Sequence, residues 1–141
     1  MRIGVYPGTF DPITNGHVDL ISRSLRLFDK VYVAVAANPQ KHPVLTLEER
    51  VEMVRVATKE LSHVEIAPFH GLLVDFVRER GAHAVIRGLR AVSDFEFELQ
   101  MALMNRNLDQ SVETVFLMPS QEYIYLTSTI IKEVARLGGD L

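Results

Sequence analysis

The chain has 141 residues, of which 48% are hydrophobic and 23% are charged, and its formal net charge is −3. This is the composition of an ordinary globular domain, without a general attraction to nucleic acid or to an anionic membrane surface. It contains no cysteine, which excludes disulfides, thiolate catalysis and cysteine-based zinc sites and agrees with a reducing compartment. The opening MRIGVYPG is not typical of a signal peptide, and no apolar run is long enough for a membrane span. We expect a single cytoplasmic domain over residues 1–141.

Short apolar runs alternate with amphipathic stretches along the chain. The runs predict five strands, at Ile3–Tyr6, Val31–Ala37, Val64–Pro68, Ala84–Ile86 and Thr114–Met118. The stretches between and after them predict helices around Val18–Phe28, from Thr46 to about Leu61, over Leu72–Glu79, from Ser93 to about Asn107, and over Thr127–Leu137. Thr46 and Ser93 each begin a capping-box pattern, whereas Gly81 and Gly138 are typical helix-ending residues. The alternation predicts a doubly wound α/β fold with a five-stranded parallel sheet.

In such a sheet, ligands bind outside the carboxyl ends of the strands. The segment YPGTFDPITNGH follows the first strand, NPQKHP with Lys41 follows the second, and RGLR with Arg87 and Arg90 follows the fourth. The fifth strand leads through PSQEYIYLTST into the last helix. Glycine backbone, hydroxyls, cationic side chains and a helix N-terminus all bind anions, so the sequence predicts a polyphosphate site at this edge.

The segment YPGTFDPITNGH is much longer than a simple reversal requires. Gly8 allows close backbone approach beside the hydroxyl of Thr9, and Gly16 allows it where the next helix starts. His17 falls in the first turn of that helix, where the helix dipole disfavours a second positive charge. We expect a neutral imidazole that donates one N–H to a ligand. A histidine that only caps or packs the helix is the alternative.

Thr14-Asn15-Gly16-His17 matches the (T/H)-x-G-H signature of the nucleotidyltransferase superfamily. The longer run YPGTFDPITNGH, IRGLRAVSDFEFELQMALMNR at 86–106, VFLMPS at 115–120 and STIIKEVAR at 128–136 closely resemble the phosphopantetheine adenylyltransferase family. The resemblance implies a Rossmann-like nucleotidyltransferase fold. It implies transfer of an adenylyl group from ATP to 4′-phosphopantetheine, which gives dephospho-coenzyme A and pyrophosphate in coenzyme A biosynthesis. It further implies Mg²⁺, a homohexamer and coenzyme A as a feedback ligand.

The resemblance also implies roles for individual residues. His17, Lys41 and Arg90 would be the catalytic residues. The phosphopantetheine-binding residues would be Thr9, Lys41, Leu73 and Arg87. The ATP-binding residues would be Thr9, Phe10, His17, Gly88, Leu89, Arg90, Glu98, Tyr123, Ile124, Tyr125, Leu126, Thr127, Ser128 and Thr129. No residue is assigned as a metal ligand. Ile124 and Thr127 stand where the family more often has serines, and the chain ends at Leu141 where family members continue through another short helical segment.

The implied chemistry agrees with the residues present. The attacking phosphate is already an anion, so the reaction requires positioning and electrostatic stabilisation rather than a strong base or a covalent intermediate. Two alternatives remain: a nucleotidyltransferase with another acceptor, and a non-catalytic nucleotide-binding module on the same fold.

Several other patterns favour plainer interpretations. His42, His63, His70 and His83 have no metal-site spacing and are expected at the surface. Met101, Met104 and Met118 are expected in the core or at a subunit contact. Phe95, Phe97, Leu99 and Met101 place more apolar surface on one helix than a single face can bury, which favours an oligomer.

Overall fold

The computed structural model describes residues 1–37, 42–89, 92–118 and 133–139. In chain order the elements are β1 (Ile3–Gly8), α1 (Asn15–Ser24), β2 (Lys30–Ala36), α2 (Leu47–Ala57), β3 (Val64–Phe69), α3 (Leu73–Glu79), β4 (Ala84–Gly88), α4 (Val92–Leu108) and β5 (Glu113–Leu117). The strands form one parallel sheet in the order β3-β2-β1-β4-β5. The predicted doubly wound α/β fold is therefore confirmed.

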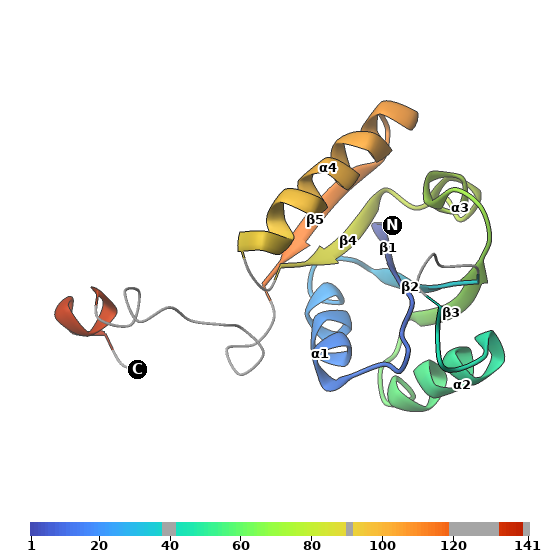
Figure 1. Ribbon diagram of the computed structural model, residues 1–141, viewed down its shortest axis with the longest axis horizontal. Helices are drawn as coiled ribbons and strands as arrows, with labels where there is room; N and C mark the ends of the chain where they lie inside the picture. The colour runs from blue at the N-terminus through green and yellow to red at the C-terminus, as the bar shows by residue number, and fades with distance from the viewer. Residues whose placement is uncertain (38–41, 90–91, 119–132, 140–141) are drawn as a thin grey trace.

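Each face of the sheet has its own apolar core, because successive strand residues point to opposite faces. On one face, Val33 and Ile86 pack with Leu20 and Ile21 of α1 and Val54 of α2. On the other, residues such as Val5 and Ala34 pack with Val74, Phe76 and Val77 of α3. Figure 1 shows α1 and α2 on one side of the sheet and α3 and α4 on the other. Each fully buried aliphatic side chain contributes roughly 1.5–3 kcal/mol.

The strand bounds differ from the predictions by one or two residues. β1 continues to Gly8, because its pairing with β2 runs as far as Gly8↔Val35. β4 continues through Arg87 and Gly88, which pair with Phe116 and Leu117 of β5. Arg87 and Gly88 were expected in a loop, and that expectation is wrong: both lie at the end of a strand.

The helix starts show one success and one error of the capping rule. At α2, the Oγ1 of Thr46 accepts from the N–H of Glu49, and Glu49 accepts from the N–H of Thr46 in return, as predicted. Helix α4, however, starts at Val92, so Ser93 occupies a helical position instead of the predicted N-cap. Helix α2 also ends at Ala57 rather than near Leu61, with Thr58 as its C-cap.

Two glycines end helices as predicted, because each adopts a positive φ that a side chain would strain: 64° for Gly81 after α3 and 82° for Gly138 near the end of the chain. Residues 133–136 are helical, but the start of the predicted last helix lies outside the described residues. Among the described helices, none has the length and apolar character to cross a membrane.

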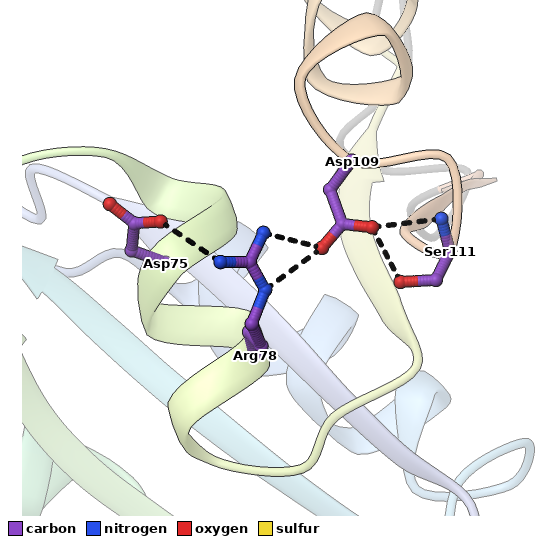
Figure 2. A network of polar contacts seen from close by, with 4 residues as sticks. All are labelled: Asp75, Arg78, Asp109 and Ser111. Carbon is purple, nitrogen blue, oxygen red and sulfur yellow. Dashed lines mark hydrogen bonds and ion pairs between the residues drawn. The ribbon is translucent and has the colours of Figure 1, made fainter.

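A polar network ties α3 to the turn that connects α4 with β5 (Figure 2). Arg78 donates to Oδ2 of Asp109 through Nε at 3.2 Å and Nη2 at 2.9 Å, and its Nη1 lies 3.7 Å from Asp75. The other carboxylate oxygen of Asp109 accepts from the backbone N–H and the hydroxyl of Ser111. These bonds lower the pKa of Asp109 to about 2. The hydrogen bond from the Ser111 hydroxyl has the largest effect, followed by the bonds from the Ser111 backbone N–H and from Arg78.

Candidate active site

A cleft opens where the strand order reverses, between β1 and β4. These strands pair at Gly4↔Ala84 and Val5↔Val85. After Val5↔Val85, the two strands are joined by a side chain instead of by backbone pairing: the carbonyl of Pro7 accepts from Nη1 of Arg87 at 3.1 Å. The cleft at this edge has a volume of about 1040 Å³. This is the position at which open α/β sheets bind their ligands.

Seven of the predicted site residues line this one cleft. They are Thr9, Phe10, His17, Leu73, Arg87, Gly88 and Glu98. Leu89 follows β4 and donates its backbone N–H to the carbonyl of Leu117, but its side chain is not part of the cleft lining. The remaining predicted residues, Lys41, Arg90 and 123–129, lie outside the described residues. The structure thus gathers residues that are up to 89 positions apart, from Thr9 to Glu98.

His17 is held in one orientation by the start of α1. It occupies the third helical position, and its Nδ1 lies 2.9 Å from the backbone N of Thr14, while Oγ1 of Thr14 accepts from the backbone N–H of His17. The two residues form a reciprocal capping box. Because a backbone N–H can only donate, Nδ1 carries a lone pair, and the proton of the neutral imidazole sits on Nε2. His17 therefore caps the helix, as in the alternative interpretation, and its Nε2 carries the proton that the predicted donor role requires.

An aromatic cluster supports the imidazole. The ring of Phe10 is buried and meets His17 edge-on with a centroid distance of 5.0 Å, and it meets Tyr6 at 5.5 Å. Phe10 has a φ of 52°, a left-handed conformation that is unusual for a bulky residue. Its ring lies directly over Gly8, where an added Cβ would come within 2.9 Å of the ring. The absence of a side chain at Gly8 therefore leaves room for the Phe10 ring.

Arg87 and Glu98, which both line the cleft, form a bidentate ion pair. Arg87 donates from Nε to Oε2 at 2.8 Å and from Nη2 to Oε1 at 2.7 Å. Burial alone would lower the pKa of Arg87, but the hydrogen bonds and charge of Glu98 outweigh it, so that pKa is raised and the guanidinium stays charged. Together with the bond to Pro7, three of the five guanidinium N–H groups are used within the described residues, which leaves two to donate to a ligand.

One wall of the cleft was not predicted from the sequence. Phe69, Gly71 and Leu72, at the exit of β3, line it together with Leu73. Phe97, Met101 and Met104 of α4 line it as well and are 44–61% exposed. The methionines were expected in the core or at a subunit contact; Met101 and Met104 are exposed and line the cleft, so they are not in the core, and the subunit contact stays a prediction. The exit of β3 carries no charged residue, so a search for anion-binding residues could not find it.

The described residues contain no group of three histidine, aspartate or glutamate side chains that could hold a metal ion. His42, His63, His70 and His83 are exposed, as expected.

The comparisons with known proteins agree with this geometry. A family model described as cytidylyltransferase-like matches residues 5–134. The chain is 55% identical over 141 residues to the phosphopantetheine adenylyltransferase of Alkaliphilus metalliredigens, covering all of this chain and 90% of the relative. It is 57% identical to the protein of that name from Alkalilimnicola ehrlichii, covering 99% of this chain and 81% of the relative.

Solved structures show the same fold at lower identity. A lipopolysaccharide core biosynthesis protein from Thermoplasma volcanium superposes with a TM-score of 0.65 at 23% identity, covering 86% of this chain and 99% of that one. The pantothenate synthetase from Thermus thermophilus superposes with a TM-score of 0.61 at 19% identity, covering 99% of this chain and 71% of that one. By its family model and its full-length relatives, the chain belongs to the cytidylyltransferase-like nucleotidyltransferases and, among them, to the phosphopantetheine adenylyltransferases.

Proposed function

We propose that this chain transfers the adenylyl group of ATP to 4′-phosphopantetheine, producing dephospho-coenzyme A and pyrophosphate. The observation that carries the proposal is the mixed lining of the cleft: Thr9, His17 and Arg87 offer polar groups, and the β3 exit and α4 add apolar side chains such as Phe69 and Met101. Phosphopantetheine has a phosphate at one end and a long, partly apolar arm, so it matches both kinds of lining. The relatives named for this reaction support the same substrates.

In this mechanism the phosphate of phosphopantetheine attacks the α-phosphorus of ATP, its bond to that phosphorus forms, and the bond to pyrophosphate breaks. Arg87, with its two remaining N–H groups, and Lys41 hold the attacking phosphate. His17 donates from Nε2 to the α-phosphate as negative charge grows there. Arg90 and the hydroxyls of Ser128 and Thr129 bind the leaving phosphates. Fixed donors of this kind stabilise the transition state without a base or a covalent intermediate.

ATP is proposed to enter as its Mg²⁺ complex, with the ion held by the phosphates themselves. Phe10, Gly88, Leu89, Glu98 and residues 123–127 are proposed to complete the nucleotide site. A cytoplasmic location follows from the same proposal, because ATP is supplied there. Coenzyme A, which contains the phosphopantetheine arm, would compete for the apolar lining of the cleft as a feedback ligand.

A homohexamer is proposed from the second apolar face of α4. Phe95, Leu99 and Leu103 recur at every fourth position, do not line the cleft and are 41–55% exposed. Such a stripe favours contact with another copy of the chain. Light scattering should give six chains per particle for the wild type and a smaller particle for Leu103→Glu. A wild-type monomer would contradict this assignment.

The proposed reaction is tested by pyrophosphate release with each pair of substrates. Release should require both ATP and phosphopantetheine and should fall strongly when CTP replaces ATP. Release of pyrophosphate with ATP and a different acceptor would favour a nucleotidyltransferase that uses another acceptor. ATP binding without release under any condition would favour the non-catalytic module.

A further inference from the structure

Arg50 of α2 is a buried cation with an unusual set of partners. It is 1% exposed, and the described residues place no carboxylate within ion-pair distance of it. A charged group is rarely buried without such a partner. Its donors instead meet backbone carbonyls: Nε donates to Leu45 at 3.2 Å, and Nη1 donates to Thr9 at 3.0 Å and to Ala36 at 2.8 Å.

These three carbonyls belong to three segments that meet at the carboxyl edge of the sheet. Ala36 is the last residue of β2, and Thr9 is the first residue after β1. Leu45 immediately precedes the N-cap of α2. One planar guanidinium thus joins the exits of two neighbouring strands to the start of a helix. Thr9 is also a lining residue of the cleft.

Asp11 makes a second connection between the same segments. Its two carboxylate oxygens accept from the backbone N–H groups of Val44 at 2.7 Å and Leu45 at 2.9 Å. The bonds from Val44 and then Leu45, helped by the charge of Arg50, lower the pKa of Asp11. Asp11 and Arg50 therefore both hold the start of α2 against the segment that follows β1.

We infer that Arg50 is a positioning residue for adenylyl transfer, which fixes the backbone of Thr9, a lining residue of the cleft, relative to the end of β2 and the start of α2. The inference rests on the proposed function. Arg50 does not line the cleft, and it acts through the backbone carbonyl of Thr9. A residue that only stabilised α2 would have no need to reach the carbonyls of two strand exits.

The test compares Arg50→Met and Arg50→Lys with Val54→Ala. Val54 is fully buried on the same helix and is not part of the cleft, so its truncation destabilises the packing of α2 without touching the three carbonyls. Thermal unfolding gives the stability of each variant, and steady-state kinetics gives kcat and the KM of each substrate. Displacement of a substrate by about 1 Å can reduce the rate by roughly 100-fold.

We expect Arg50→Met to lower kcat by about 100-fold and to raise the KM for both substrates, because Thr9 is assigned to both. Arg50→Lys keeps the charge and should recover much of the stability. Its compact ammonium cannot reproduce the fork that reaches all three carbonyls, so it should not recover kcat. Val54→Ala should lower the melting temperature with kcat within about twofold of wild type.

Two results would overturn the inference. One is a kcat for Arg50→Met equal to the kcat of Val54→Ala when the two variants have similar stability, and the other is a kcat for Arg50→Lys equal to that of the wild type. If Arg50→Met does not fold, Arg50→Lys alone decides, since a kcat equal to wild type would remove the positioning role. Failure of the proposed function looks different, because the wild type would then release no pyrophosphate from ATP and phosphopantetheine.

Discussion

Arg87 reaches from the end of β4 to Glu98 on α4, and both oxygens of the Glu98 carboxylate accept from its guanidinium, at 2.7 and 2.8 Å. The pair connects the strand at the reversal point of the sheet with a helix that also lines the cleft. It fixes the direction of the two remaining N–H groups of Arg87. The ion pair is therefore part of the site as well as part of the fold.

Glu98→Gln should destabilise the protein by about 1–3 kcal/mol, because the substitution removes a charge-assisted pair from a largely buried position. Urea unfolding measures this change. Glu96→Gln, on the same helix but exposed, is the matched control and should change stability by less than about 0.5 kcal/mol. Equal effects of the two substitutions would show that the pair contributes little.

His17→Gln separates the two roles of the histidine. Glutamine at the third helical position can complete a capping box with Thr14, so stability should stay within about 0.5 kcal/mol of wild type. The imidazole donor is lost, so kcat should fall by roughly 100-fold, the effect of removing one transition-state donor. Thr14→Ala should show the reverse pattern, with lower stability and a smaller effect on kcat. If His17→Gln retains kcat, Nε2 is not a catalytic donor.

Gly8→Ala should destabilise the protein by about 1–3 kcal/mol, because the new methyl group would overlap the ring of Phe10. The displaced ring would also lose its contact with His17, so activity should fall in the same variant. The double variant Gly8→Ala/Phe10→Leu removes the overlapping ring atoms and tests the cause. If the loss from Gly8→Ala is unchanged in the Phe10→Leu background, steric contact with the ring is not the explanation.

The contribution of Asp109 to stability should depend on acidity. Its pKa is lowered to about 2 in the folded state, from an unfolded value of about 3.9. A lowered carboxyl pKa stabilises the fold above the unfolded pKa, and this contribution disappears as pH falls through about 2. The stability difference between wild type and Asp109→Asn should therefore be constant from pH 5 to 7 and shrink toward pH 2. A difference that grows at low pH would contradict this assignment.

Lys41→Ala should raise the KM for phosphopantetheine or lower kcat while leaving ATP affinity nearly unchanged. The reason is that the lysine is proposed to neutralise the attacking phosphate, which is absent until the acceptor binds. Calorimetric titration with ATP and steady-state kinetics with both substrates measure the two effects. Unchanged kinetics with phosphopantetheine would remove Lys41 from the acceptor site.

The sequence predicted the strands and the edge of the sheet at which the cleft lies, because apolar runs and their exits are local features. It also predicted the capping box at Thr46, whose residues follow the usual pattern. A cap formed by His17 was only the alternative interpretation, because histidine replaces the glutamate or glutamine of that pattern. The start of α4 was predicted wrongly: Ser93 fits the capping-box pattern, but the helix already begins at Val92.

Long-range contacts explain the rest of what the sequence could not provide. Arg50 looks like a surface residue in the pattern LEER, yet it binds the carbonyl of Thr9, which is 41 positions away. The pairing of Arg87 with Glu98 and the apolar wall from β3 and α4 also depend on the tertiary arrangement. No periodicity or motif encodes these contacts in one segment.

The central claim is that the cleft joins ATP to phosphopantetheine. The most direct measurement is mass spectrometry of the products formed from ATP, Mg²⁺ and 4′-phosphopantetheine by the full chain. The account predicts dephospho-coenzyme A and pyrophosphate in equal amounts, with neither product when the acceptor is omitted. Pyrophosphate formed without the acceptor, or bound ATP with no adenylylated product, would contradict it.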